Sequence, residues 1–164
     1  MKTLLLAEWG KPFYPRLRTR YPREALIEAY SPSDILREVK DAEAVFGYLT
    51  GGQFDAARKL RWIQTLDAGM EGLFNRVPQI AESGVTVTNA RGAGAAQIGE
   101  HALALILHFA RGIHEFSRLQ RERKWDQDYG LGIVQMISGK TAGIIGFGKS
   151  GREIGWRCKA MGMN

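Results

Sequence analysis

The sequence predicts an α/β protein that has a parallel-sheet domain, a long connecting helix and the beginning of a second α/β domain. Three observations lead to this prediction. Strand-like and helix-like segments alternate through residues 1–94, which is typical of a parallel sheet covered by helices. Residues 95–124 keep a helical period without a proline. A glycine-rich turn at residues 146–151 then joins a strand-like segment to a helix-like one.

Strands and helices are expected to alternate within the first domain. Short apolar or β-branched runs predict strands at residues 3–9, 44–50, 61–69 and 85–90. Apolar residues at helical spacing predict helices at residues 22–30, 31–42 and 54–60. We expect Ser33 or Asp34 to cap the second of these helices, and Gly69 to end the third strand.

The connecting helix carries apolar residues at steps of three and four: Ile98, Ala102, Leu105, Ile106, Phe109, Ile113 and Phe116. Its centre, ALALILHF, is apolar on nearly every side. A helix that is apolar all round is buried all round. We therefore expect this helix to pack between two domains or between two subunits. After Trp125 the helical pattern is replaced by a loop that contains glycines.

Composition limits the class of protein. Hydrophobic residues make up 45% and charged residues 24% of the chain, a balance typical of soluble globular proteins. No apolar run is long enough to cross a bilayer, and Glu8 interrupts the short apolar run at the N-terminus, so we predict a cytoplasmic protein without a membrane partner. The single cysteine, Cys158, excludes an internal disulfide. A net charge of +6 raises the question of a nucleic-acid partner, but no nucleic-acid-binding motif supports one.

The glycine-rich turn fits the pattern G-x-G-x-x-G over Gly146, Phe147, Gly148, Lys149, Ser150 and Gly151. In that pattern the first glycine permits the tight turn, the second lets the backbone approach a pyrophosphate, and the third lets helix and strand pack closely. A helix that starts near Lys149 would direct its free N–H groups at the phosphates. The acidic residue expected about 20 residues further on would lie past residue 164. A tight strand–helix turn without a ligand is the alternative reading.

Four ordered stretches together carry a resemblance to a known family. They are LRWIQTLDAGMEGL (60–73), GVTVTNARGAGAAQIGEHALALILHFAR (84–111), Trp125, and ISGKTAGIIGFGKSGREIGWRCKAMGM (137–163). The chain resembles the D-isomer-specific 2-hydroxyacid dehydrogenases. The resemblance implies a flavodoxin-like substrate domain at residues 1–94, an interdomain and dimerisation helix at 95–125, and the truncated start of a Rossmann NAD(P)-binding domain at 126–164.

The resemblance also implies the ligands and their sites. The cofactor would be NAD or NADP, bound by the turn at Gly146–Gly151, and the substrate a small 2-hydroxy or 2-keto acid. Ala68, Gly69 and Met70 would form the substrate site, with the N–H groups of Gly69 and Met70 holding the carboxylate, and Leu49 and Thr50 could line the same cleft. A homodimer would form through the helix around residues 95–125. The residues alone, without the resemblance, favour a plain turn at the end of a strand for the segment around Gly69.

The resemblance places the family's catalytic arginine, acid and histidine downstream of the glycine-rich turn, so none is expected in this chain. All three histidines, His101, His108 and His114, lie on the connecting helix. His101 is expected to pack at the domain junction. His108 and His114 are six residues apart, which would put them on different faces and excludes a metal pair at i, i+4. Cys158 is expected to serve packing.

Two function classes remain open on this basis. The chain is either the N-terminal part of a dehydrogenase, inactive by itself, or a non-catalytic remnant that dimerises and binds a ligand. A single Rossmann strand cannot form a sheet. Residues after about 126 are therefore expected to be disordered, to aggregate or to pair with a partner chain.

Overall fold

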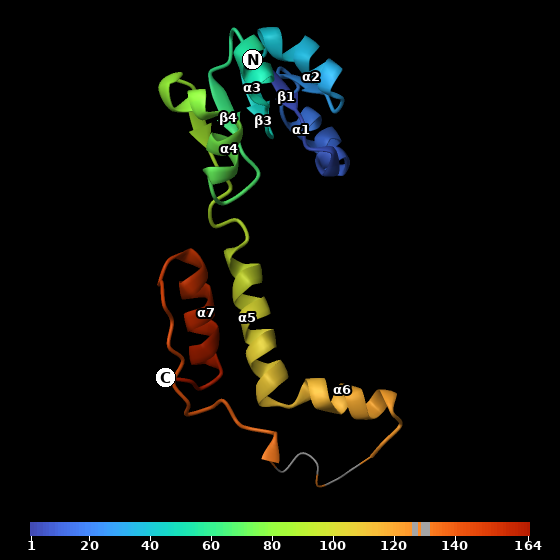
Figure 1. Ribbon diagram of the computed structural model, residues 1–164, viewed down its shortest axis with the longest axis vertical. Helices are drawn as coiled ribbons and strands as arrows, with labels where there is room; N and C mark the ends of the chain where they lie inside the picture. The colour runs from blue at the N-terminus through green and yellow to red at the C-terminus, as the bar shows by residue number, and fades with distance from the viewer. Residues whose placement is uncertain (126–127, 129–131) are drawn as a thin grey trace. The chain divides into compact units, whose positions relative to one another are not determined.

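The computed structural model describes residues 1–125, 128 and 132–164. These residues form two compact units, Met1–Arg91 and Gly92–Asn164, which are drawn from blue to green and from yellow to red in Figure 1. Each unit is described separately below.

The first unit is built on a sheet of parallel strands. They are β1 (Lys2–Leu5), β2 (Ala25–Glu28), β3 (Ala44–Phe46), β4 (Trp62–Gln64) and β5 (Thr86–Thr88). Their order is β2-β1-β3-β4-β5, which is the order of flavodoxin-like sheets. The predicted α/β class and parallel sheet are confirmed. The strand order reverses between β1 and β3, and ligands of such sheets bind near this reversal, beyond the carboxyl ends of the strands.

Short helices connect the strands of this unit. They are η1 (Glu8–Phe13), α1 (Tyr14–Arg20), α2 (Pro32–Glu38), η2 (Val39–Asp41), α3 (Gly51–Ala56), α4 (Glu71–Arg76) and η3 (Pro78–Glu82). The core lies where Leu4, Val45 and Ile63 of neighbouring strands meet Val39 and Leu73, all at most 1% exposed. Each of these strand residues has the same place in the register, so their side chains share one face of the sheet.

Two predictions for this unit are wrong. Residues 25–28, expected in a helix, form β2, because their backbone pairs with β1 and Ile27 packs against the core. The helical spacing of Ala25, Leu26 and Ala29 spans barely one turn, and strand pairing overrides it. The cap of α2 is Ser31, whose Oγ accepts a hydrogen bond from the Asp34 backbone N–H at 3.1 Å, rather than Ser33 or Asp34.

The second unit contains α5 (Ala95–Ala110), α6 (Ile113–Arg121) and α7 (Lys149–Ala160). The prediction of one continuous helix over residues 95–124 is wrong, because the chain turns at Gly112. Gly112 has a left-handed φ of 62° and is buried, and a Cβ there would lie 2.9 Å from Cγ2 of Ile133. Only glycine adopts this conformation readily. The apolar period continues across the break, so it does not reveal the turn.

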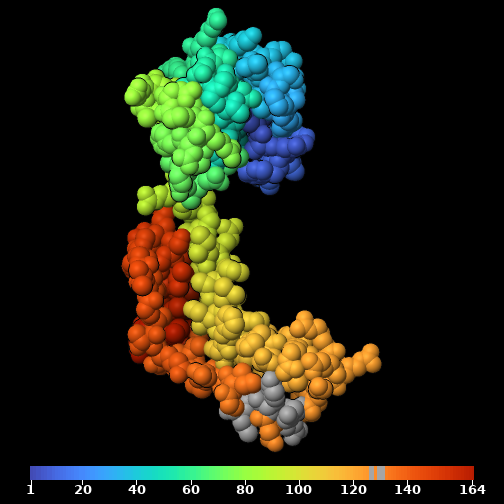
Figure 2. Space-filling model, viewed as in Figure 1, coloured from blue at the N-terminus to red at the C-terminus, as the bar shows by residue number. Residues whose placement is uncertain are grey.

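Helices α5 and α7 pack closely against each other, as Figure 2 shows. A Cβ at Gly99 of α5 would lie 3.0 Å from the Glu153 backbone carbon of α7, so the absence of a side chain permits this approach. Cys158 is 3% exposed in the cluster beneath, with Ile137 and Met163, which confirms its expected packing role. Met161, three residues after Cys158, is the C-cap residue of α7 and is 39% exposed. Among the described residues, no helix is long and apolar enough to cross a membrane.

The strand predicted before the glycine-rich turn does not form over residues 143–147. Strand formation requires a neighbouring strand, and in the described part of the chain only residues 139–142 of this segment pair with one. Asn164 donates to the Lys140 carbonyl and accepts from the Ala142 N–H, both at 2.8 Å, and Gly139 donates to the Gly162 carbonyl. This alternation is the hydrogen-bond pattern of parallel strands. The chain after α7 therefore returns beside the segment that precedes the turn, as in a β-α-β unit.

Candidate functional site

The predicted substrate residues Ala68, Gly69 and Met70 lie in a loop that follows β4 in the first unit, here called the substrate loop (residues 65–70). It lies at the carboxyl end of a strand next to β3, where ligands of parallel sheets bind. Backbone and side-chain hydrogen bonds tether it to the end of β5 and the residues that follow that strand. The Thr65 N–H donates to the Thr88 carbonyl at 2.8 Å, the Ala90 N–H donates to the Asp67 carbonyl at 3.0 Å, and Asn89 Nδ2 donates to the Ala68 carbonyl at 2.8 Å.

Tyr48, which follows β3, binds the same loop from the other side. Its hydroxyl donates to Asp67 Oδ2 and accepts from the Asp67 backbone N–H at 3.1 Å. The Arg76 guanidinium, at the end of α4, lies 5.1 Å from the centre of the Tyr48 ring. Burial, together with the Asp67 carboxylate, raises the pKa of Tyr48 above its ordinary value. The hydroxyl therefore keeps its proton and remains a donor at neutral pH.

The predicted substrate residues differ in how far they are exposed to solvent. Ala68 is exposed, whereas Gly69 and Met70 are partly buried, and Met70 also packs against the core. Leu49 is 1% exposed within the core, so its side chain does not line a surface site as predicted. Thr50 caps α3 in a reciprocal arrangement with Gln53, which occupies its hydroxyl. Sequence reasoning missed Tyr48, although its position directly after a strand beside β4 is a usable signal.

The Glu71 carboxylate folds back over the substrate loop. A Cβ at Gly69 would lie 2.7 Å from Glu71 Oε1, so the carboxylate occupies the space beside Gly69. An incoming substrate carboxylate would meet this charge. Like charges at close range repel, and this repulsion weakens with salt.

The glycine-rich turn of the second unit has the geometry that its sequence requires. Gly146 has a φ of 90°, and α7 starts at Lys149 with Gly148 as its N-cap and without a side-chain capping bond. A Cβ at Gly148 would meet nothing within 4 Å, whereas one at Gly151 would lie 3.2 Å from the Gly146 carbonyl carbon. The space at Gly148 and the helix start fit a dinucleotide pyrophosphate.

The side chains around this turn are mostly accessible. Phe147 is 63% exposed and Ser150 is partly buried. Lys149 extends along Gly92, where a Cβ would lie 2.7 Å from Lys149 Nζ. Gly92 has a φ of 89°, so glycine is favoured there for its backbone as well as for the space it leaves to the lysine.

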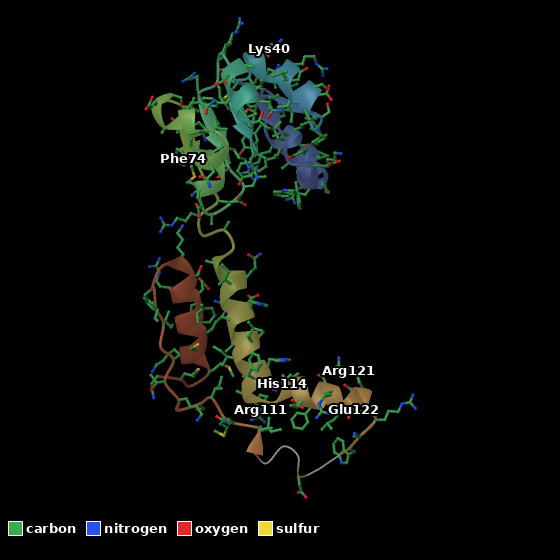
Figure 3. All side chains as sticks on the ribbon, viewed as in Figure 1. Lys40, Phe74, Arg111, His114, Arg121 and Glu122 are labelled. Carbon is green, nitrogen blue, oxygen red and sulfur yellow. The ribbon has the colours of Figure 1, made fainter. Side chains whose placement is uncertain are left out.

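None of the three histidines belongs to the substrate loop or to the glycine-rich turn. The turn at Gly112 brings the rings of His108 and His114 to 5.4 Å between centroids, so the prediction that they occupy separate faces is wrong. Figure 3 shows His114 at the corner between α5 and α6. No group of three metal-ligating side chains forms within the described part of the chain. The His101 side chain is exposed on α5, and its packing at a domain junction stays a prediction.

Comparison with known proteins matches residues 103–164 to the family model described as D-isomer specific 2-hydroxyacid dehydrogenase, NAD binding domain. The D-3-phosphoglycerate dehydrogenase of Archaeoglobus fulgidus is 34% identical over 82% of this chain and 25% of its own length. A D-isomer specific 2-hydroxyacid dehydrogenase family protein from Aeromonas salmonicida shares the fold with a TM-score of 0.83 and 25% identity, over 99% of this chain and 51% of that one.

A third similar protein is the D-lactate dehydrogenase from Aquifex aeolicus, solved with NAD and lactic acid, with a TM-score of 0.72 and 24% identity over 99% of this chain and 49% of that chain. The chain thus spans about half the length of these solved structures and a quarter of the curated relative. The fold and the turn define a flavodoxin-like α/β protein with part of an NAD-binding domain. The chain belongs to the D-isomer-specific 2-hydroxyacid dehydrogenase family.

Proposed function

We propose that this chain is the N-terminal part of an NAD(P)-dependent D-2-hydroxyacid dehydrogenase. Such an enzyme moves a hydride between the nicotinamide and the C2 carbon of a 2-hydroxy or 2-keto acid. The observation that carries the proposal is the turn at Gly146–Gly151, which leaves open space at Gly148 and starts a helix without a side-chain cap. The same residues match an NAD-binding domain. NAD or NADP would supply the hydride acceptor when bound.

Each part of the chain then has a role. Residues 1–94 form the substrate domain, residues 95–125 link the domains, and residues 126–164 begin the cofactor domain. The N–H groups of Gly69 and Met70 would hold the substrate carboxylate, because backbone amides reach a small anion where side chains are absent. The tethers from Tyr48 and Asn89 support this role, since they hold the loop at the ligand-binding edge of the sheet.

We also propose that the chain forms a homodimer through α5 and α6. An apolar stripe is exposed along these helices: Ile98, Leu105, Phe109, Ile113 and Phe116 are 38–63% exposed. Large exposed apolar patches mark interaction surfaces. The centre of the connecting helix is predicted to be buried on all sides, but α7 covers only part of α5. A second copy of the chain, packed on the exposed stripe, would bury the rest.

The dimer is tested by analytical ultracentrifugation of Phe109→Glu beside Trp9→Glu. Both residues are more than 60% exposed, but Trp9 lies in the first unit. We expect Phe109→Glu to shift the protein to monomer and Trp9→Glu to leave the dimer intact. A wild-type monomer at tens of micromolar would reject this part of the proposal.

Cofactor binding is tested by titrating the ¹⁵N-labelled chain with NAD⁺ and NADP⁺. We expect amide shifts to concentrate at residues 146–151. Gly148→Ala is the sharpest variant, because its Cβ meets nothing in the free protein and would occupy the pyrophosphate space. Gly143→Ala, also in open space, is the matched control. Equal binding by both variants would contradict the proposed site.

Nucleotide binding separates the two function classes, because neither class predicts turnover by this chain alone. The resemblance assigns no catalytic residue to this sequence, so we expect the 164-residue chain to reduce no 2-keto acid with NADH. A chain that dimerises but binds neither nucleotide would favour the alternative, a non-catalytic remnant that binds a ligand. We propose a cytoplasmic location, supported by the use of a single cysteine. Cell fractionation tests it.

A further inference from the structure

We infer that Tyr48 is the positioning residue of the substrate loop: its hydroxyl holds Asp67, and thereby the backbone of Gly69 and Met70, in place. The inference rests on the proposed substrate role of this loop. It concerns a residue in another strand connection, 19 positions away from Asp67 in the chain.

Asp67 is held at three of its polar atoms. Tyr48 accepts from its N–H and donates to its carboxylate, and the Ala90 N–H donates to its carbonyl. Two of these three contacts depend on one hydroxyl oxygen. Gly69 follows two residues later without a side chain to anchor it, so the position of its N–H depends on the residues before it.

The Tyr48 ring connects the loop to the helix that follows it. Arg76, in the last turn of α4, lies over the ring at 5.1 Å, within the range of a cation–π interaction. Met70 is the residue directly before α4. Tyr48 therefore contacts one residue near the start of the loop and one at the end of the helix that the loop leads into. Removal of the hydroxyl alone would abolish both hydrogen bonds between Tyr48 and Asp67 and retain the ring contact.

Tyr30 provides a matched control elsewhere on the sheet. Its hydroxyl donates to the Glu28 carboxylate near the end of β2, and Lys11 lies 4.2 Å from its ring centre. The two tyrosines thus share the same arrangement of carboxylate, phenol and cation. Of these two tyrosines, Tyr48 forms hydrogen bonds to the substrate loop and Tyr30 does not.

The first experiment compares Tyr48→Phe and Tyr30→Phe in the ¹⁵N-labelled, ligand-free chain. We expect Tyr48→Phe to shift the amide signals of Ala68, Gly69 and Met70 and to speed their hydrogen exchange about tenfold, the effect of losing one hydrogen bond to a charged group. Tyr30→Phe should leave these signals unchanged. Loop amides that behave alike in the wild type and both variants would overturn the inference.

The second experiment titrates the same proteins with D-lactate. We expect Tyr48→Phe to weaken the affinity about tenfold and Tyr30→Phe to change it less than about twofold. Asp67→Ala removes the partner instead, and in a double-mutant cycle it should add little to Tyr48→Phe. Fully additive effects would count against positioning through Asp67. If Asp67→Ala folds poorly, the comparison of Tyr48→Phe with Tyr30→Phe in the first experiment still decides the matter.

The two experiments separate the inference from the function on which it rests. If the wild type binds no 2-hydroxy acid at residues 68–70, the proposed substrate role fails, and the ligand-free amide signals still judge the role of Tyr48. If the wild type binds D-lactate and Tyr48→Phe binds it equally well, the inference fails and the proposed role stands.

Discussion

Gly151 lies directly against Gly146: a Cβ added to Gly151 would be 3.2 Å from the Gly146 carbonyl carbon and closer still to its oxygen. The start of α7 therefore packs directly against Gly146, the first residue of the glycine-rich turn. Gly148, between them, faces open space. The three glycines therefore differ in what they do, since two shape the turn and one leaves room.

Gly151→Ala should destabilise the second unit. The added methyl group cannot be accommodated by a side-chain movement, because its closest neighbour is backbone. We expect the free energy of unfolding to fall by about 1–3 kcal/mol, the usual effect of overpacking, and NAD⁺ affinity to fall with it. Urea denaturation followed by circular dichroism measures the first effect. Gly148→Ala should keep the stability and lose the affinity, and a Gly151→Ala protein as stable as the wild type would contradict this reading.

The turn could be predicted from sequence because all of its determinants lie within six consecutive residues. The positions of β3, β4 and β5 could be anticipated for the same kind of reason, since each lies within a short apolar or β-branched run. Strand β2 could not be predicted in this way, because its residues also fit a short helical spacing. The choice between helix and strand depends on pairing with β1, which is a separate segment of the chain.

The substrate loop shows the same limit. The role of Gly69 follows from the family resemblance of residues 60–73, but the hydrogen bonds that hold the loop come from Tyr48 and Asn89, which are distant in sequence. Leu49 was expected beside the substrate because it ends a strand, yet alternation places its side chain in the core and Tyr48 on the loop. At Gly112, the apolar period persists across a break that only the backbone conformation reveals.

Glu71→Gln should strengthen binding of a 2-hydroxy acid. The Glu71 carboxylate lies beside Gly69, where the substrate carboxylate is proposed to bind. Removal of one like charge near a protein surface should raise D-lactate affinity roughly threefold to tenfold at low salt, and less at high salt. Isothermal calorimetry at two salt concentrations measures this. Glu82→Gln, in η3, removes the same charge without touching Gly69 and should have little effect. Equal effects from both variants would argue against a local role for Glu71.

The first unit should lose stability in acid through its carboxylate partners. The Tyr30 hydroxyl and Arg18 lower the pKa of Glu28, while Arg37 and Lys2 lower that of Glu38 and Lys2 lowers that of Asp41. A lowered folded-state pKa contributes stability above the ordinary values of 4.5 for Glu and 3.8 for Asp, and this contribution is lost as pH falls through the folded-state pKa.

This loss is measured by urea unfolding between pH 6 and pH 2.5, in steps of about half a pH unit. We expect Glu28→Gln to reduce the stability at pH 6 and to flatten its decrease in acid, whereas Glu82→Gln should follow the wild-type curve. A wild-type stability that stays constant down to the lowest pH would contradict the role of these ion pairs.

Hydrogen exchange should divide the last part of the chain in two. Residues 152–160 lie in α7, which packs on α5 around the buried Cys158, so their amides should exchange slowly. Residues 143–147 form no ladder with another strand among the described residues, and Ile145 is fully exposed, so their amides should exchange rapidly in the monomer. Mass spectrometry of exchanged peptides measures both.

Slow exchange throughout residues 143–147 in a monomer would contradict this expectation, and slow exchange only at high concentration would indicate pairing with a second copy. Rapid exchange in α7 as well would restore the broader expectation of disorder after residue 126.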